Sequence, residues 1–186
     1  MIRLVAHLLR NVRAGEHKLV WHDPAVATAP ASIRLTSSAF EPGGAIPHRC
    51  AGAGVGENRS PDLAWQGIPP DAVELALIIE DPDAPLPRPF VHAIVTGIPA
   101  QSTGFEEGAL SQPDLGARLG RNSFRRTAYS GPRALPGHGP HTYAFQLFAL
   151  DRKIALAHPP DRKAFRRAVT GAVLARGRLD GRFERP

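Results

Sequence analysis

Apolar side chains alternate along several segments of the chain in the way that β-strands require. Residues 73–80 place apolar residues at every second position and two more between them, which predicts a buried strand. Residues 90–99 and 141–151 predict two further strands, and residues 32–40 predict a fourth. Within the third of these segments, Tyr143, Phe145 and Leu147 share one face.

Two other segments carry apolar residues at helical spacing. Residues 2–13 predict a short amphipathic helix. The 18 glycines and 19 prolines among 186 residues favour turns between short strands over a helical bundle. Near the end of the chain, Asp161 is a favourable N-cap for a second helix, whose apolar side would hold Phe165, Val169, Ala172 and Val173.

These patterns together predict a mainly β protein with one helix near each end. We expect residues 1–30 to form an N-terminal amphipathic helix and linker, and residues 31–186 to form one β-rich domain of ordinary size. Three roles are open for the N-terminal helix: docking on the domain, joining a homodimer, or touching a membrane surface. Docking or dimerisation is favoured, because so short a helix buries little area by itself.

The cysteine content and the hydropathy pattern bear on the compartment. Cys50 is the only cysteine, so the chain has no internal disulfide, which favours a reducing compartment. His7 and Arg10 interrupt the apolar part of the N-terminal segment, which is atypical of a signal peptide. No apolar run approaches the roughly 20 residues that span a bilayer. We therefore expect a cytoplasmic protein without stable membrane insertion.

The net charge of +6 comes largely from the C-terminal segments 161–169 and 175–186. A basic helix and tail are typical of a solvated surface, and no recognised nucleic-acid motif accompanies them. We therefore expect no nucleic-acid partner. Attraction to anionic ligands or acidic surfaces is the safer inference from this charge.

Acidic, imidazole and phenol side chains occur at the ends of the predicted strands. Asp81 and Asp83 lie on a proline-rich turn that follows the first strand, and His92 lies just inside the second. His141 and Tyr143 begin the third and share a face, whereas alternation places His92 opposite both of its flanking residues. If these strands are neighbours, all five side chains converge at one end of a sheet.

Simpler interpretations of these residues remain open from the sequence alone. Asp81 and Asp83 are also what a turn with local capping requires. His92 also fits a hydrogen-bonded core histidine. The best interpretation of His48 and His138 is as loop residues, although His138 also fits the rim of a pocket. Cys50 is expected to be an inert small hydrophobic residue.

Four stretches, taken together, resemble the phosphatidylethanolamine-binding protein family, and most closely its bacterial Raf-kinase-inhibitor-like (YbhB/YbcL) branch. They are "SPDLAW" at 60–65, "DPDAP" at 81–85, "HAIVTGIP" at 92–99 and "GPRALPGHGPHTYAFQLFALD" at 131–151. The resemblance covers roughly residues 32–176. It implies a Greek-key β-sandwich of two antiparallel sheets with a small pocket for phosphate, acetate or phosphorylated head groups.

The resemblance also assigns residues to that pocket. Asp81 and His92 take the places of the family's pocket acid and pocket histidine, and His141 and Tyr143 match its H-x-Y segment. Pro85 falls on the family's proline-rich turn, where the Ala84–Pro85 bond is a candidate for the cis form. Asp83 is expected to support this turn, and we count it among the ligand-binding residues.

The loop that forms one lip of the pocket departs from the family pattern. The family has adjacent prolines in a "GPxPPxG" loop, whereas this chain has Ala134 and Leu135 there, so the rigidity and ligand preference of the lip are open. We count Leu135 as a lip residue and Gly137 as a place where backbone N–H groups approach the ligand. Arg125 and Arg126 stand where a glycine-containing turn is expected.

The leading functional hypothesis is non-enzymatic binding of a small anion, phosphate or phosphoethanolamine-like, with no catalytic residue, metal or cofactor. A protein target, as for the kinase and protease inhibitors of the family, is one extension of it. A second hypothesis is a metal-dependent hydrolase with Asp81, Asp83, His92 and His141 as ligands, and a third is a basic interaction module.

Overall fold

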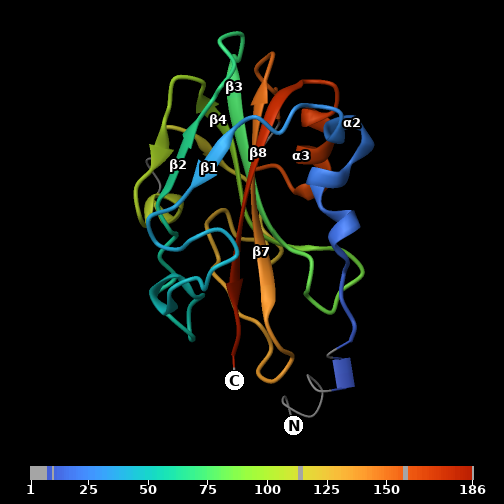
Figure 1. Ribbon diagram of the computed structural model, residues 1–186, viewed down its shortest axis with the longest axis vertical. Coiled ribbons are helices and arrows are strands. Elements are labelled where there is room, and N and C mark those ends of the chain that lie inside the picture. Colours follow the sequence, from blue (N-terminus) through green and yellow to red (C-terminus); the bar gives the residue numbers. More distant parts are fainter. Residues whose placement is uncertain (1–7, 10, 113–114, 157–158, 186) are drawn as a thin grey trace.

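A computed structural model describes residues 8–9, 11–112, 115–156 and 159–185. Two antiparallel sheets form the body of the protein (Figure 1), which confirms the predicted mainly β sandwich. The larger sheet has the order β6-β4-β3-β7-β8, with β3 at Glu74–Asp81, β4 at Phe90–Pro99, β6 at Arg118–Leu119, β7 at His141–Leu150 and β8 at Val173–Phe183. The smaller sheet has the order β1-β2-β5, with bounds Arg34–Thr36, Leu63–Gln66 and Gly104–Phe105.

Short helices complete the described elements. The α-helices are α2 at Pro24–Ala27 and α3 at Arg162–Val169. The 3₁₀ helices are η1 at Glu16–Lys18, η2 at Val20–His22, η3 at His48–Cys50 and η4 at Ala109–Ser111. Among the described residues, no helix is long and apolar enough to cross a membrane.

The central strand β3 is buried on both faces, as its almost continuous apolar sequence requires. On one face, Leu75 and Leu77 join a core that fills the space between the two sheets and includes Trp65 of β2. On the other face, Ile78 packs with Val26 and with Phe165 of α3. Figure 1 shows α2 and α3 covering the side of the larger sheet opposite to β1 and β2. The strands predicted over residues 73–80, 90–99 and 141–151 are thus confirmed.

The predicted C-terminal helix begins as expected but ends earlier. Asp161 caps α3, since its carboxylate accepts a hydrogen bond from the backbone N–H of Ala164 at 2.9 Å. The helix ends at Val169, and the chain turns at Gly171, whose φ is +67°. Ala172 and Val173 therefore do not belong to the helix, and the prediction is wrong for these two residues.

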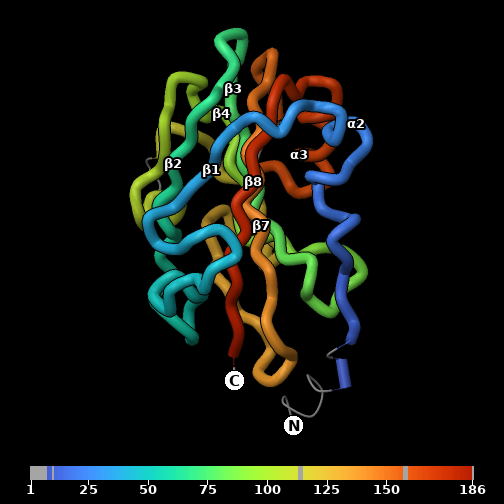
Figure 2. Tube along the Cα trace, viewed as in Figure 1, coloured from blue at the N-terminus to red at the C-terminus, as the bar shows by residue number. Residues whose placement is uncertain are grey.

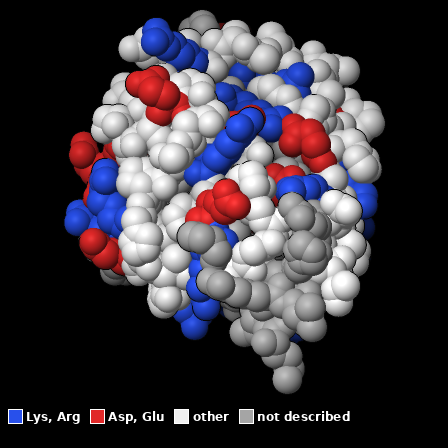
Figure 3. Space-filling view, turned by 60° about the horizontal axis from the view of Figure 1, so that its bottom comes forward, with Lys and Arg blue, Asp and Glu red and all other residues white. Residues whose placement is uncertain are grey.

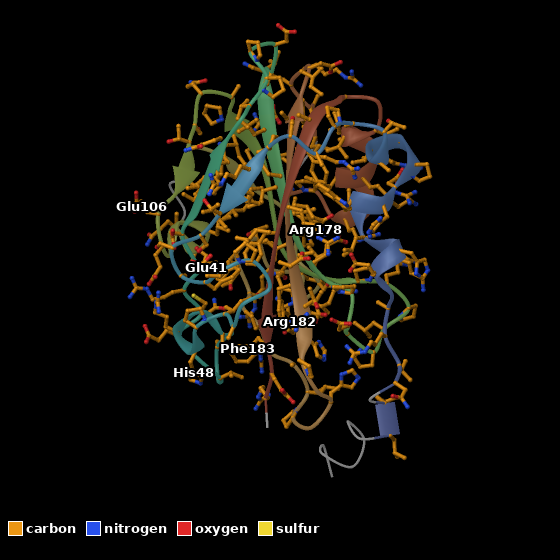
Figure 4. All side chains as sticks on the ribbon, in the orientation of Figure 1. Glu41, His48, Glu106, Arg178, Arg182 and Phe183 are labelled. Atoms are coloured by element: carbon orange, nitrogen blue, oxygen red, sulfur yellow. The ribbon has the colours of Figure 1, made fainter. Side chains whose placement is uncertain are left out.

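The basic C-terminal segment is the strand β8, which the sequence pattern did not reveal. Its four buried residues alternate with charged ones, but two of the four, Gly177 and Gly181, are glycines, so the apolar periodicity is weak. At Gly177 a Cβ atom would lie 2.5 Å from the carbonyl oxygen of Ile33, which explains the small residue. Figure 4 shows Arg178 midway along β8, with Arg182 and Phe183 closer to its end.

The N-terminal segment runs along the larger sheet before it enters β1 (Figure 2). Of the helix predicted over residues 2–13, residues 2–7 and 10 lie outside the described part; residues 8 and 9 are helical, and residues 11–13 are not. Backbone N–H groups of Ala14 and Gly15 then donate to the carbonyls of Ala84 and Pro82, at 2.9 Å each. This segment is therefore bonded to the proline-rich turn after β3.

Candidate ligand-binding site

The antiparallel order of the larger sheet brings the end of β3 beside the beginnings of β4 and β7. Asp81, the last residue of β3, is paired with Phe90, the first residue of β4. A pocket of about 220 Å³ lies at this end of the sheet. Its apolar wall consists of Ala84, Pro85, Leu86, Phe90, Ala134 and Leu135. Its polar side chains are Asp81, His92, Arg133 and His141.

Both carboxylate oxygens of Asp81 are occupied by hydrogen bonds. Oδ1 accepts from the backbone N–H groups of Asp83 at 2.7 Å and Ala84 at 3.1 Å, which closes the turn after β3. Oδ2 lies 2.7 Å from Nδ1 of His141. Asp81 therefore fixes both the turn and the ring of His141.

His141 continues a chain of hydrogen bonds that leads out of the pocket. Its Nε2 lies 2.8 Å from Nδ1 of His138, and Nε2 of His138 lies 2.9 Å from the carbonyl oxygen of Leu9. The carboxylate of Asp81 and the carbonyl of Leu9 both accept, so each outer ring nitrogen must carry a proton, and one proton must lie between the rings. The complete chain thus requires three ring protons, which gives the pair of histidines one positive charge.

This positive charge is balanced within the pocket wall. Nδ1 of His141 lies 2.7 Å from the carboxylate of Asp81, so the positive charge of the histidine pair lies beside a negative charge. Because both nitrogens of His141 are engaged, this charge acts on a ligand through space rather than through a free N–H group.

Asp83 is directed away from the pocket. Its Oδ2 accepts from the backbone N–H of Thr142 at 2.7 Å, and its Oδ1 lies 2.7 Å from the guanidinium of Arg13. It therefore fastens the turn after β3 to the start of β7 and to the N-terminal segment, and does not line the pocket.

His92 owes its position to a β-bulge. The register between β3 and β4 shifts from Ile79–Ala93 to Glu80–Val91, which leaves His92 without a partner in β3. Val91 and Ala93 consequently belong to different cores, so the expectation that His92 lies opposite both of them is wrong. Strict alternation fails because the bulge inserts one residue.

The bulge turns the ring of His92 toward the pocket and β7. Its ring centroid lies 5.0 Å from that of Tyr143, edge to face, and 5.2 Å from that of Phe90. Its Nδ1 is hydrogen-bonded to the carbonyl oxygen of Ser130, which therefore orients this ring. The carboxylate of Asp81 contacts His141 and not His92, so the two predicted pocket residues Asp81 and His92 have separate partners.

Two buried polar atoms lack a hydrogen-bond partner among the described residues: Nε2 of His92, which lines the pocket, and the hydroxyl of Tyr143, which contacts the His92 ring but does not itself line the pocket. Since the carbonyl of Ser130 only accepts, Nδ1 of His92 carries the proton. Burial lowers the pKa of His92, so the ring is neutral and Nε2 exposes a lone pair. Burial raises the pKa of Tyr143, so its hydroxyl keeps its proton and can donate it.

The altered lip lies over the pocket. Arg133 reaches across Gly52, where its aliphatic carbons occupy the space that a Cβ would fill, and its guanidinium lies 5.7 Å from the ring centroid of Phe124. Leu135 lines the pocket, whereas Gly137 does not; the N–H of Gly137 donates to the carbonyl of Arg185 at 3.0 Å. The Ala84–Pro85 bond is trans, in contrast to the candidate cis form.

A comparison with protein-family models identifies the family to which this chain belongs. The model of the family described as "Phosphatidylethanolamine-binding protein" matches residues 36–184. The chain belongs to the phosphatidylethanolamine-binding protein family.

Individual relatives agree with this assignment. A protein of Methanothermobacter thermautotrophicus named "UPF0098 protein" is 38% identical over 156 residues, which cover 82% of this chain and 99% of that protein. The "Putative lipoprotein LppC" of Mycobacterium tuberculosis is 38% identical over 166 residues, covering 86% and 77% respectively. The crystal structure of YbcL from E. coli, titled a new member of the mammalian PEBP family, is 27% identical with a TM-score of 0.78, and covers 84% of this chain and 100% of that one.

Several residues that line or support this pocket were not singled out from the sequence, and His138 was assigned only to a loop or a rim. Phe90 could have been found, because it is two residues before His92 on a predicted strand. Arg133 and Ser130 lie in the lip loop, where no periodicity places a side chain or carbonyl. His138 required the turn at Gly139, whose φ is +99°, to bring it back onto His141.

Proposed function

We propose that this family member binds a small anion in the pocket without transforming it, and that the ligand carries a phosphate or carboxylate group. The observation that carries the proposal is the pair of buried, unpartnered polar atoms, Nε2 of His92 and the hydroxyl of Tyr143. Buried polar groups in native proteins are almost always hydrogen-bonded, so two such atoms beside one pocket favour a ligand with several oxygens.

The charges around the pocket support an anion over a cation. The carboxylate of Asp81 lies 2.7 Å from Nδ1 of His141, which belongs to the histidine pair whose hydrogen bonds require one positive charge. Arg133 at the mouth adds a second cation and can pair with a phosphate oxygen. The six apolar wall residues leave room for a short carbon chain attached to the anionic group. Phosphoethanolamine combines these features and is the probe of choice.

The alternative of a metal-dependent hydrolase is not favoured. Three of the four ligands that it would need are already engaged: Asp81 and His141 with each other, and Asp83 with Arg13, so that only His92 keeps a free nitrogen. Throughout the described ranges, no group of three or more histidine, cysteine, aspartate or glutamate side chains is arranged to hold a metal.

The alternative of a basic interaction module is also not favoured, because two arginines of β8 are engaged with the rest of the protein. Arg176 donates to the carbonyls of Trp21, Ala27 and Ala29 and stacks 4.0 Å above the Trp21 ring. Arg178 pairs with Asp180 and with Glu16. Figure 3 shows basic and acidic side chains interspersed on the face that comes forward, rather than one basic surface.

The biological role that we propose is that of a regulator whose activity depends on the filled pocket, with a kinase or protease as its target. Family membership supports this role. We propose the cytoplasm as its compartment, which the single unpaired cysteine supports.

Histidine NMR during titration with phosphoethanolamine tests the binding proposal. The ring signals of His92 should shift in a saturable manner, and those of His48, which is exposed on η3, should not. Tyr143→Phe should weaken binding about 10-fold to 100-fold, since one hydrogen bond to a charged ligand is lost. Ring signals of His92 that ignore phosphoethanolamine, phosphate and acetate alike would overturn the proposal.

A further inference from the structure

The unpartnered nitrogen of His92 presents a problem to any anion that enters the pocket. The carbonyl of Ser130 fixes the proton on Nδ1, so Nε2 offers a lone pair. A fully deprotonated phosphate monoester, a carboxylate or a sulfate offers only lone pairs as well. Two facing acceptors repel each other, so such a contact is stable only when a proton lies between the two atoms.

From this geometry we propose that the pocket binds its anion together with one proton, held between Nε2 of His92 and a ligand oxygen. The inference rests on the proposed function, because it concerns the same anion site. It defines the ligand class more narrowly: the favoured ligand is an anion that readily carries an acidic hydrogen, above all the singly protonated form of a phosphate monoester.

The other titratable groups around the pocket do not offer a place for this proton. The pair His138–His141 already has the three ring protons that its hydrogen bonds require. A fourth would set two N–H groups against each other between the rings. Both carboxylate oxygens of Asp81 already take part in hydrogen bonds, to the N–H groups of Asp83 and Ala84 and to Nδ1 of His141.

The remaining two polar groups are donors. The Tyr143 hydroxyl, buried and unpartnered, can donate to a second ligand oxygen. Arg133 stays charged at the mouth and attracts the anion without exchanging a proton. Among the described residues that line the pocket, His92 is thus the one that has a basic nitrogen with a free lone pair.

The arrangement discriminates between anions of the same shape. A phosphate monoester has its second pKa near 6 and can supply the shared proton at little cost. A sulfate monoester is a far stronger acid, so its binding requires His92 itself to become a buried imidazolium, which burial disfavours. We therefore expect phosphoethanolamine to bind at least about tenfold more tightly than ethanolamine O-sulfate at pH 7, a difference of about 1.4 kcal/mol.

Calorimetric titration with phosphoethanolamine between pH 6 and pH 8.5, in buffers with different ionisation enthalpies, measures the proton directly. Uptake of about one proton is expected near pH 8, with affinity falling about tenfold per pH unit above pH 7. His92→Gln places an amide that can donate at the position of Nε2, so its binding should take up no proton. His48→Gln, altered on the exposed η3, should behave like the unaltered chain.

The outcomes separate this inference from the proposed function. Binding of phosphoethanolamine without proton uptake, or equal proton uptake in His92→Gln, would overturn the inference while leaving the anion site intact. Equal affinities for phosphoethanolamine and ethanolamine O-sulfate at pH 7 would also overturn it, and this comparison needs no variant. Absence of binding at every pH would overturn the proposed function, and the inference with it.

Discussion

Nδ1 of His138 lies 2.8 Å from Nε2 of His141, and both rings are buried. This contact connects the pocket wall to the N-terminal segment, since His138 also bonds to the carbonyl of Leu9. The ligand site and the start of the described chain are therefore joined by a single line of hydrogen bonds that starts at Asp81.

Replacement of His138 tests how much this line of hydrogen bonds contributes to the stability of the protein. His138→Ala leaves Nε2 of His141 buried without a partner and frees the carbonyl of Leu9, so unfolding free energy should fall by about 1–3 kcal/mol. His48→Ala, on the exposed η3, should change it by less than about 0.5 kcal/mol. Urea denaturation measures both. Equal effects of the two substitutions would show that the His138–His141 contact contributes nothing to stability.

The lowered pKa of His92 predicts a pH dependence of stability with a definite sign. Burial depresses its pKa, so the folded protein binds fewer protons at this site than the unfolded chain. The stability that this neutral ring contributes is complete above the unfolded value of about 6.5, and it declines as the pH falls from there toward the lowered folded value.

Comparison of the unaltered chain with His92→Gln isolates this contribution. The stability of the unaltered chain relative to the variant should fall by up to about 1.4 kcal/mol per pH unit below pH 6.5 and stay constant above it. Urea denaturation at pH 5 to pH 8 without ligand provides the data. If the stability of the unaltered chain relative to His92→Gln instead rises as the pH falls, the His92 ring is protonated in the folded protein.

Much of this fold and part of the site could be predicted from the sequence. Leu75 and Leu77 on one face and Ile78 on the other predicted β3, because a strand packed on both faces must be apolar. The register of that strand with its neighbours then brings Asp81, His92 and His141 to one pocket. The strand β8 escaped because close packing requires glycine where an apolar residue would have revealed the alternation.

Two other features lie beyond what periodicity reveals. The bulge at His92 changes which side the ring faces, and a bulge depends on the pairing of two strands rather than on either sequence alone. The partners of His92 and His141, a loop carbonyl and a loop histidine, are likewise set by tertiary turns. Sequence reasoning therefore found the residues of the pocket better than their partners.

A buried carboxylate ties α3 to the larger sheet and predicts a large effect of one arginine. Glu80 is fully buried, accepts from Val20 N–H and from the Gln146 amide, and is paired with Arg162. Arg162→Met would leave this charge without its cation and should lower unfolding free energy by about 3 kcal/mol. Arg166→Met is the control, since Arg166 is half exposed and 3.4 Å from Asp23; it should cost less than about 0.5 kcal/mol.

The reverse test of this pair neutralises the carboxylate. Adding Glu80→Gln to Arg162→Met should recover part of the lost stability, because no charge then remains buried at this point. If the double variant is less stable than Arg162→Met, the loss comes from packing of the arginine side chain and not from an unpaired charge.

Cys50 should be unreactive in the folded protein. It is fully buried, and burial raises the pKa of its thiol to about 11, so almost no thiolate is present at neutral pH. Alkylation by iodoacetamide at pH 7.5 should proceed only through opening of the structure and should reach the unfolded rate in denaturant. Fast stoichiometric labelling of the native protein would contradict the burial of Cys50 at the end of η3.

Arg125 predicts a site where glycine improves stability. Its φ of +63° lies in the left-handed region, which costs a residue with a side chain about 1–2 kcal/mol. Arg125→Gly removes this cost but gives the unfolded chain more freedom, so a net gain of about 0.5 kcal/mol is expected. Arg126 is not among the residues with positive φ, so Arg126→Gly should instead lose about 0.5–1 kcal/mol. The midpoints of thermal or urea unfolding of the two variants should thus shift in opposite directions. A loss of stability in both variants would show that the turn at Arg125 is not left-handed in solution.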